Sequence, residues 1–422
     1  MTPVQVVGIG LDGSAGLAAS VRQMVEQATV LVGSVRHLNY FPDHPAVRLT
    51  VNDIHHAMQA IRQTLALEAD PRIVVLASGD PLFFGLGRLL LAELPPDQLT
   101  FHPHLSAVQL AFSRVKLPWQ DARLISAHGR SLDELTRALQ QGAAKIAVLT
   151  DGKNTPAAIA HLLLALELPS HYQLWVCENL GGQEERVQPF VATDLVNRTF
   201  DPLNVVLLCR SDMAQPLELA HLPAFGLPDG CFLSFSDRPG LMTKREVRIL
   251  VLGELALQPH QTIWDIGAGT GSVSIEIARL FPSSRLYAIE QTAAGTALIE
   301  QNKERFQVEH VNAINGTAPA ALMDLPAPDR IFIGGSGGHL AQLLEVCGSR
   351  LAVNGVIVLA LATLEHLSIV MNWLTQQSTA ADAWQHRWLQ VQLSRSVPVG
   401  TLTRYTPLNP VTLLTIAKSL HR

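Results

Sequence analysis

The chain has 422 residues, of which 48% are hydrophobic and 16% are charged, and its formal net charge is −5 at pH 7. High apolar content with few charges predicts compact globular structure in two or three domains and argues against disorder. The acidic balance argues against nucleic-acid binding through a broad basic surface.

The cysteines and apolar segments argue against several further classes of protein. The four cysteines are scattered without a C-x-x-C pair, which predicts neither a disulfide framework nor a zinc site. The first residues, MTPVQVVGIG, are typical of a strand rather than a signal peptide, and the longest apolar runs are too short to cross a bilayer. We therefore expect a cytoplasmic protein with no membrane segment and no bound metal.

The first half alternates strand-like and helix-like segments, which predicts an α/β domain over residues 1–212. The pattern restarts near Pro118, so we expect two lobes, 1–117 and 118–212. Strands are expected at 4–11, 30–32, 72–77, 99–105, 122–127, 146–150, 172–177, 186–190 and 205–209. Helices are expected at 15–28, 53–69 and 106–117. A further helix is expected to open with a capping box of Ser131 and Glu134, and another to follow the strand at 146–150 and end near residue 168.

Residues 213–240 are rich in proline and glycine and have weak periodicity, which predicts a linker. A second domain, 241–422, opens with a helix for which Thr243 and Glu246 predict a capping box. Seven strands are expected there, with helices between them until an antiparallel final pair. They lie at 263–266, 286–289, 308–313, 330–334, 356–362, 388–397 and 411–416.

The first strand–helix–strand unit of this second domain carries the most informative motif. Gly267, Gly269 and Gly271 follow a buried strand and open a helix, so the backbone can turn tightly and approach a ligand. Glu290 ends the next strand, 19 residues after Gly271, where a carboxylate can accept hydrogen bonds from ribose hydroxyls. The unit predicts a nucleoside site, and the alternative is a tight turn that binds nothing.

The glycine spacing distinguishes between cofactors. A dinucleotide fingerprint, G-x-G-x-x-G, would need glycine where Ser272 or Ser274 stands, which argues against an NAD-dependent oxidoreductase. The observed G-x-G-x-G, preceded by Asp265, resembles motif I of the class I S-adenosylmethionine (SAM) methyltransferases. The seven predicted strands match the Rossmann-like sheet of that class.

Longer stretches of both halves resemble known domain families. The C-terminal half, with MTKREVR, WDIGAGTGSVSIEIAR, YAIE, FIGGSGG and ATLE, resembles the precorrin C15-methyltransferase (decarboxylating) domain. The N-terminal half, with GIGLDG, ASGDPLFFG, SAVQLAFSRVKLPWQDARLISAHGR and CENLGG, resembles the precorrin C5-methyltransferase domain of the tetrapyrrole methylase superfamily. The resemblance implies a bilobal tetrapyrrole methylase fold followed by a seven-stranded class I methyltransferase fold.

The resemblance also implies one SAM site in each domain. In the second domain the matching positions are Thr243, Asp265, Gly267, Ala268, Gly269, Thr270, Gly271, Glu290, Gly316, Thr317 and Ala318. In the first domain, where the superfamily holds SAM between its lobes, they are Gly10, Gly79, Asp80, Pro81, Ser106 and Ala107. Asp80 could instead be a helix N-cap. Thr317 stands where relatives are expected to carry a carboxylate, so it would contact the adenine as a neutral group.

The implied activity belongs to cobalamin biosynthesis: methylation of a small-molecule tetrapyrrole at C5 and C15, with loss of the C12 acetate carboxyl group. Methylation of a nucleophilic meso carbon mainly requires alignment of the reacting atoms. The family resemblance further implies a homo-oligomer formed through the C-terminal domain, and no nucleic-acid or membrane partner is expected.

Two residues are candidates for the chemistry itself. Glu365 follows the fifth strand of the second domain, where a ligand should sit, and could assist decarboxylation; the alternative is an acid favoured at a helix start. Arg245 could contact a substrate carboxylate, and the alternative is an exposed surface arginine.

Other functions stay open at this point. The same chemistry could act on a cobalt-containing tetrapyrrole, or a SAM-dependent methyltransferase could act on another substrate. A SAM-binding or RNA-associated module without catalysis is a third possibility. Residues 334–338, GGSGG, satisfy the G-x-S-x-G of a hydrolase nucleophile elbow, but they follow the fourth strand, where methyltransferases place substrate-facing loops.

Overall fold

The structure, a computed structural model, describes residues 3–51, 54–67, 71–168, 170–211, 217–235, 237–377, 384–399 and 402–418. The chain forms two compact units. The first contains Met1–Leu135, Ala144–Ala160 and Gln173–Cys209, and the second contains Thr136–Ala143, His161–Tyr172 and Arg210–Arg422. In the described ranges no helix is both long and apolar enough to cross a membrane.

The first unit begins with a five-stranded parallel sheet in the order β3-β2-β4-β1-β5. Its core strands are almost wholly apolar and buried, as expected when helices cover both faces of a parallel sheet. The strands are β1 (Val4–Ile9), β2 (Val30–Gly33), β3 (Val47–Thr50), β4 (Ile73–Ser78) and β5 (Leu99–His102). The helices are α1 (Ala19–Glu26), α2 (Val35–Asn39), α3 (Ile54–Leu67) and α4 (Gly87–Glu93).

A second five-stranded sheet follows in the chain, in the order β6-β7-β10-β8-β9. It is mixed: β6 and β7 run parallel, whereas β7–β10 and β8–β9 are antiparallel pairs. The strands are β6 (Arg123–Ser126), β7 (Lys145–Leu149), β8 (His171–Glu178), β9 (Arg186–Phe190) and β10 (Asn204–Ser211). The helices are α5 (Ala107–Val115), α6 (Asp133–Gln140), α7 (Pro156–Ala165) and α8 (Ala192–Leu195).

The second unit contains a seven-stranded sheet in the order β13-β12-β11-β14-β15-β19-β16. The first five strands are parallel, and β19 runs antiparallel to both β15 and β16, which confirms the predicted class I fold and its antiparallel final pair. The strands are β11 (Thr262–Ile266), β12 (Arg285–Glu290), β13 (Val311–Asn315), β14 (Arg330–Ile333), β15 (Val356–Leu361), β16 (Trp384–Val391) and β19 (Val411–Lys418).

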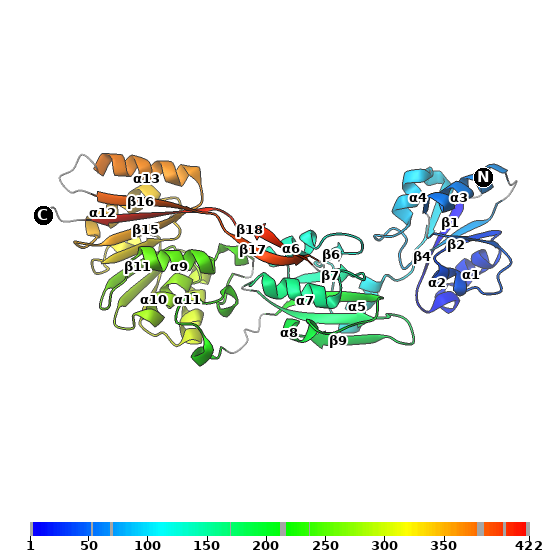
Figure 1. Ribbon diagram of the computed structural model, residues 1–422, viewed down its shortest axis with the longest axis horizontal. Coiled ribbons are helices and arrows are strands. Elements are labelled where there is room, and N and C mark those ends of the chain that lie inside the picture. Colours follow the sequence, from blue (N-terminus) through cyan, green and yellow to red (C-terminus); the bar gives the residue numbers. More distant parts are fainter. Residues whose placement is uncertain are drawn as a thin grey trace. The chain divides into compact units, whose positions relative to one another are not determined.

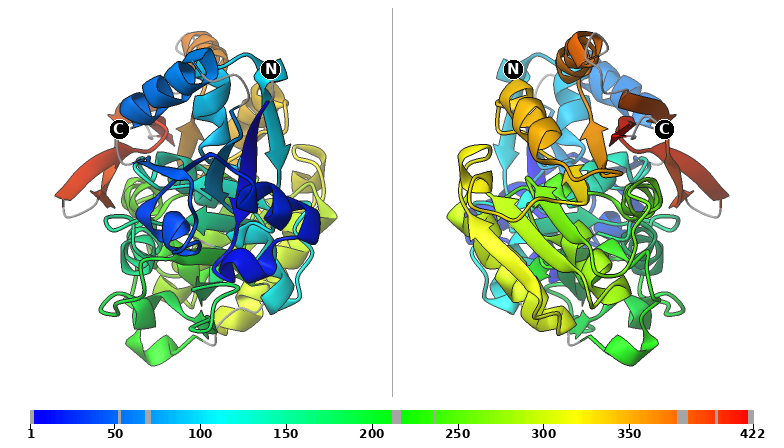
Figure 2. Two further views of the ribbon diagram at one scale, coloured as in Figure 1. Left: turned by 90° about the vertical axis from the view of Figure 1, so that its right-hand side faces the viewer. Right: turned by 90° about the vertical axis from the view of Figure 1, so that its left-hand side faces the viewer.

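Helices cover both faces of this sheet (Figure 1), and an apolar layer lies on each face. Because side chains alternate along a strand, Ile263 of β11 enters one layer and Trp264 and Ile266 enter the other. The first layer is completed by helices α9 (Arg245–Glu254), α10 (Ser272–Leu280) and α11 (Ala293–Phe306). The second is completed by α12 (Leu340–Arg350) and α13 (Leu364–Gln377), which lie together on one side of the sheet (Figure 2, right).

The predicted strand 388–397 is wrong, because the chain changes partner within it. Strand β16 ends at Val391, and β17 (Ser394–Val399) then pairs with β18 (Leu402–Pro407) in a separate two-stranded sheet. This hairpin projects from the seven-stranded sheet (Figure 1). The alternation of apolar residues does not change where a strand changes its pairing partner. The sequence pattern therefore predicted one strand where the structure has two.

Several boundaries in the first half also differ from expectation. The helix predicted at 15–28 begins only at Ala19, because Gly13–Gly16 form a 3₁₀ turn. Helix α2 and strand β3 were not predicted, and the helix expected directly after Asp80 begins only at Gly87, as α4. Asp53 and residues 68–69, the predicted ends of α3, lie outside the described residues. The Ser131 hydroxyl contacts Asp133, the first residue of α6.

The capping box predicted for Thr243 and Glu246 is also wrong. Helix α9 begins at Arg245, its N-cap Lys244 makes no side-chain capping bond, and the backbone N–H of Arg245 donates instead to Asp229 at 3.0 Å. Glu246 instead lies 2.7 Å from Arg395 of β17, and the Thr243 carbonyl accepts a hydrogen bond from Arg248. Charged partners distant in the chain therefore replaced the local contact that the sequence pattern favoured.

Candidate active sites

A cavity of about 250 Å³ lies at the carboxyl ends of strands β11 to β14 in the second unit. Ligands of parallel α/β sheets bind at this edge, where the loops that follow the strands leave a crevice. Six residues predicted to bind the cofactor line the cavity: Gly267, Gly269, Glu290, Gly316, Thr317 and Ala318. They come from loops after three successive strands, so only the folded sheet brings them together.

The loop after β11 presents bare backbone to this cavity. Gly267 has a φ of +69°, and a Cβ there would lie 2.5 Å from the carbonyl oxygen of Gly335, in the loop after β14. Gly269, with a φ of +57°, has open space at its Cβ position within the described structure. A side chain at Gly269 would therefore occupy space in the cavity, whereas one at Gly267 would clash.

Glu290 is held rigidly at the end of β12. Its side chain is 8% exposed, and Oε1 accepts hydrogen bonds from the backbone N–H and the hydroxyl of Thr292 at 2.9 and 2.8 Å. Oε2 accepts from the backbone N–H of Gly269 at 3.1 Å. Since each carboxylate oxygen can accept two bonds, Oε2 retains one position for a ligand hydroxyl. A second ligand hydroxyl would require the Thr292 hydroxyl to turn away.

Asp265 is fully enclosed behind the glycine loop. Its Oδ2 accepts hydrogen bonds from the N–H and hydroxyl of Ser274, which fastens β11 to α10. Burial raises the pKa of Asp265 to about 6, the bonds from Ser274 oppose that shift, and the nearby Glu290 adds to it. Within the described chain, Thr243, Asp265, Ala268, Thr270 and Gly271 do not line the cavity, so their predicted contacts with a cofactor would have to be indirect.

Sequence reasoning missed the contribution of the segment before α9. Phe235, Arg238 and Leu241 line the cavity, although most of this segment was predicted to be a linker. Arg238 provides the only basic side chain among the described lining residues, and its guanidinium lies 5.3 Å from the centre of the Phe235 ring. The sequence carries no motif that marks these residues, because the segment has neither helical nor strand periodicity.

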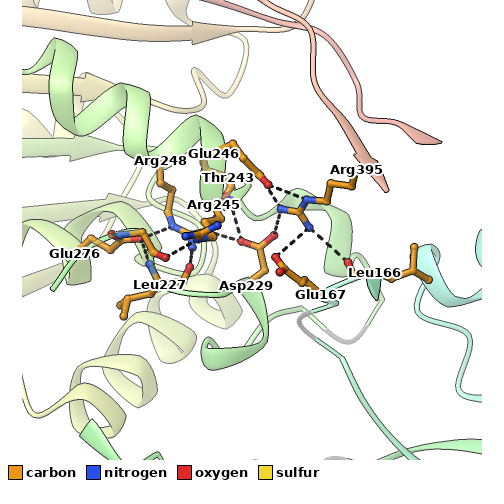
Figure 3. A network of polar contacts seen from close by, with 11 residues as sticks. Leu166, Glu167, Leu227, Asp229, Thr243, Arg245, Glu246, Arg248, Glu276 and Arg395 are labelled. Atoms are coloured by element: carbon orange, nitrogen blue, oxygen red, sulfur yellow. Dashed lines mark hydrogen bonds and ion pairs between the residues drawn. The ribbon is translucent and has the colours of Figure 1, made fainter. Parts of the chain in front are cut away.

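A buried network of charges holds that segment against the helices (Figure 3). Arg248 of α9 donates to Glu276 of α10 and to Asp229 of the segment, each at 2.8 Å, and all three side chains are at most 1% exposed. Arg395 of β17 donates to the second oxygen of Asp229 at 3.2 Å and to Glu246. The network therefore positions the wall of the cavity and anchors the hairpin to the same point.

The two candidate catalytic residues lie outside the cavity lining. Arg245 donates from Nε to the carbonyl of Gly226 at 2.6 Å, so its side chain helps to hold the preceding segment (Figure 3). Glu365 is exposed in the first turn of α13, just after β15. Its position at the carboxyl end of the sheet agrees with the sequence expectation, and its role stays a prediction.

A second glycine-lined region lies in the first unit, where three chain segments cross. A Cβ at Gly8 would lie 1.9 Å from the carbonyl oxygen of Gly79, and one at Gly79 would lie 3.0 Å from the Cα of Ser106. Gly79 has a φ of +60° and donates its N–H to the carbonyl of Ile9. The structure thus brings together the loops after β1, β4 and β5, from which cofactor-binding residues were predicted.

The polar residues of these loops have local structural partners. Asp80 accepts the N–H of Leu82 at 2.9 Å and so closes a turn well before α4 begins. The Ser106 side chain caps α5 in a reciprocal capping box with Gln109. These bonds explain why the residue types occur there, and the predicted contacts of Gly10, Gly79, Asp80, Pro81, Ser106 and Ala107 with SAM stay predictions.

Comparison with known proteins finds two family models, one for each half of the chain. A family model described as "Tetrapyrrole (Corrin/Porphyrin) Methylases" matches residues 3–196, and one described as "Precorrin methyltransferase domain" matches residues 234–418. The "Precorrin-6Y C(5,15)-methyltransferase [decarboxylating]" of Sinorhizobium sp is 34% identical over 412 residues, which cover 96% of this chain and 94% of that protein.

Two shorter proteins of Salmonella typhimurium each match about half of this chain. The "Cobalt-precorrin-6B C(15)-methyltransferase (decarboxylating)" is 35% identical over 192 residues, which cover 46% of this chain and 96% of that protein. The "Cobalt-precorrin-7 C(5)-methyltransferase" is 34% identical over 204 residues, which cover 48% of this chain and 97% of that protein.

Proposed function

Because the chain belongs to the family of precorrin-6Y C(5,15)-methyltransferases (decarboxylating), we propose that it methylates precorrin-6Y at C5 and C15 and removes the carboxyl group of the C12 acetate, giving precorrin-8X. The chain is a SAM-dependent methyltransferase of cobalamin biosynthesis. Two methyl transfers to different carbons are most simply served by one SAM site in each of two domains, 1–212 and 241–422.

The cavity beside Gly267, Gly269 and Glu290 carries this proposal for the second domain. The glycines leave room for a nucleoside against the backbone, and the fixed carboxylate of Glu290 is an acceptor for a ribose hydroxyl. The residues present therefore fit SAM, which when bound supplies an activated methyl group on its sulfonium.

The protein contributes mainly alignment to the two methyl transfers. A meso carbon of the reduced tetrapyrrole is already nucleophilic, so the enzyme must hold that carbon in line with the methyl group. Rigid elements suit such alignment, because the Gly267 loop is locked against Gly335 and Glu290 is fixed by Thr292 and Gly269. Arg238, at the cavity, would bind one of the substrate's carboxylates and orient the macrocycle.

Decarboxylation requires a place for the electrons of the breaking carbon–carbon bond. The conjugated macrocycle can accept that electron pair, and the acetate carbon then takes up a proton as CO2 leaves. Glu365 is our candidate for assisting this step from the carboxyl end of β15, and Arg245 remains a candidate for a substrate carboxylate. A cationic neighbour to the ring-side charge and exclusion of water would both lower the barrier.

The half-length relatives support a division of labour between the domains. One is named as a C5-methyltransferase and the other as a decarboxylating C15-methyltransferase, and each matches about half of the chain. We assign C5 methylation to residues 1–212, where the tetrapyrrole methylase model matches, and C15 methylation with decarboxylation to residues 241–422.

A cobalt-containing substrate is the second candidate, because both half-length relatives are named for cobalt-precorrins. The full-length relative is named for precorrin-6Y, which favours the metal-free substrate. We also propose that the protein is cytoplasmic. We further propose that it forms a homo-oligomer through residues 241–422, and sedimentation velocity measures that oligomeric state directly.

Mass spectrometry of the tetrapyrrole product tests the proposal. The whole chain is incubated with SAM and with either precorrin-6Y or its cobalt form. The expected product has gained two methyl groups and lost one CO2. SAM binding without any change in the mass of either substrate would leave a SAM-binding protein and refute the proposed activity.

A further inference from the structure

Arg36, His37 and Ser78 form a polar cluster at the carboxyl ends of β2 and β4 in the first unit. These strands are neighbours, and the chain leaves them in opposite directions, from β2 to β3 at one edge and from β4 towards β5 at the other. Open α/β sheets bind ligands at such a point. Ser78 also directly precedes Gly79 and Asp80, so the cluster adjoins the loop predicted to hold SAM.

The three side chains contact one another. One terminal nitrogen of Arg36 lies 2.9 Å from the Ser78 hydroxyl oxygen and 3.3 Å from Nε2 of His37. Nε2 of His37 lies 3.1 Å from the same hydroxyl. A guanidinium can only donate, so Ser78 accepts from Arg36, and its own hydroxyl proton is available to a His37 ring that accepts at Nε2.

His37 is suited to this role because it is uncharged. Its side chain is 6% exposed, and burial, with a smaller contribution from Arg36, lowers its pKa to about 4. At neutral pH the ring therefore keeps a lone pair. The backbone N–H of His37 also donates to Ser34, the N-cap of α2, which fixes the start of this short helix.

Among the contacts of the described residues, Arg36 donates only through one terminal nitrogen, which holds the guanidinium in a defined orientation. The guanidinium is half-buried, and no carboxylate of the described residues lies within 4.0 Å of it. Some arginines of this unit are paired with acids, such as Arg62 with Glu93 and Arg114 with Glu185, and others, such as Arg22 and Arg48, donate to backbone carbonyls. A guanidinium held by neutral partners matches the planar geometry of a carboxylate and can bind it with two parallel hydrogen bonds.

We propose that Arg36 binds a carboxylate side chain of the tetrapyrrole during C5 methylation, and that Ser78 and His37 hold the guanidinium in place. The inference rests on the proposed function, which supplies a substrate with many acetate and propionate groups. Arg36 would then set the orientation of the macrocycle beside the methyl donor. Ser78 and His37 act as positioning residues that do not touch the substrate.

Steady-state kinetics of the whole chain test this assignment, with C5 and C15 methylation followed separately in the same sample. In Arg36→Gln we expect the KM for C5 methylation to rise about ten- to hundredfold with little change in kcat, because one charged hydrogen-bonding group is lost. C15 methylation and CO2 loss should match the wild type. Arg36→Lys should be intermediate, since lysine keeps the charge and loses the paired hydrogen bonds.

The matched control is Arg62→Gln, which removes a surface arginine of the same unit and should leave both reactions unchanged. Ser78→Ala should raise the KM for C5 methylation, but by less than Arg36→Gln does. Ser78→Thr should leave that KM near the wild-type value, because threonine keeps the hydroxyl group. A purely structural role for Ser78 would instead lower stability and kcat together.

Two outcomes would overturn the inference. One is an Arg36→Gln enzyme with a wild-type KM at C5. The other is a SAM dissociation constant that rises as much as the KM, which would place Arg36 at the cofactor. If the wild type methylates neither carbon, the proposed function itself fails, and that result differs from a wild type that is active and insensitive to Arg36→Gln.

Discussion

Arg248 of α9 and Glu276 of α10 form a fully buried ion pair, with Nε of the arginine 2.8 Å from Oε1 of the glutamate. Glu276 also accepts the backbone N–H groups of Gly226 and Leu227, and Arg248 also binds Asp229 (Figure 3). One pair of side chains thus joins two helices to the segment that walls the candidate SAM cavity.

Arg248→Met should destabilise the second unit strongly. Removing the cation leaves Glu276 buried without its cationic partner and leaves Asp229 with Arg395 as its remaining one, at a cost of about 3–5 kcal/mol. Urea denaturation followed by tryptophan fluorescence measures the free energy of unfolding. The control is Arg387→Met, because Arg387 is 65% exposed and its partner Glu254 keeps a hydrogen bond from Thr415; there the expected loss is below about 1 kcal/mol. Equal losses in both variants would contradict the structural role of the buried pair.

Gly267→Ala should abolish SAM binding in the second domain only. Its Cβ would lie 2.5 Å from the Gly335 carbonyl oxygen at a positive φ, so the two loops must separate. Isothermal titration of the whole chain with SAM should fall from two sites to one. Gly253→Ala, in α9 with open space at its Cβ position, should keep both sites. A Gly267→Ala chain that still binds two SAM molecules would refute the assignment of this cavity.

Glu290→Gln should weaken SAM binding at that same site by about ten- to hundredfold, because a hydrogen bond to a charged group is replaced by one to a neutral group. The C5 reaction of the first domain should be unaffected. Glu300→Gln, which alters an exposed glutamate on α11 paired with Lys303, is the matched control. Unchanged SAM affinity in Glu290→Gln would show that the carboxylate only holds the loop residues Gly269 and Thr292 in place and does not bind the ligand.

Arg238→Gln should raise the KM of the C15 reaction while the dissociation constant of SAM stays within about twofold, as expected when a charge-assisted contact to substrate alone is lost. The control is Arg285→Gln, an exposed arginine at the opposite, amino-terminal end of β12. Product analysis by mass spectrometry gives the KM of the C15 reaction for both variants. If SAM binding weakens instead, Arg238 contacts the cofactor.

Asp265 should make stability depend on pH. Burial raises its pKa in the folded protein from 3.8 to about 6. Between about pH 4 and pH 6, therefore, the folded state keeps a proton that the unfolded state has released. This contribution to stability is complete below about pH 4 and is lost as the pH rises through about 6. Relative to Asp265→Asn, the wild type should lose about 3 kcal/mol of unfolding free energy between those limits. Denaturation of both chains at several pH values checks this, and a constant difference would contradict it.

Local patterns predicted the parts of the fold whose causes are local. Strands β11 and β12, the glycine turn between β11 and α10, and the acid at Glu290 all follow from residues within one strand–helix–strand unit. The glycine spacing also argued against a dinucleotide, since the placement of each glycine along the turn is a property of the sequence alone.

Partners distant in the chain decided the remainder. Arg248 and Arg395 carried no distinguishing mark in the sequence, yet Arg248 is buried between acids, and Arg395 reaches Asp229 from 166 residues away. Likewise, 388–397 divided into two strands because its second part found a partner in β18.

By itself, the sequence determined the fold class, the glycine turns and the acid at the end of β12, because these depend on backbone conformation and on spacing within about 30 residues. Only the tertiary structure decided that Phe235 and Arg238 wall the cavity and that Arg36 lies beside Ser78 and the Gly79 loop, with no acid of the described residues paired to it. Burial and charge pairing are properties of the assembled layers, and no local window of the chain contains them.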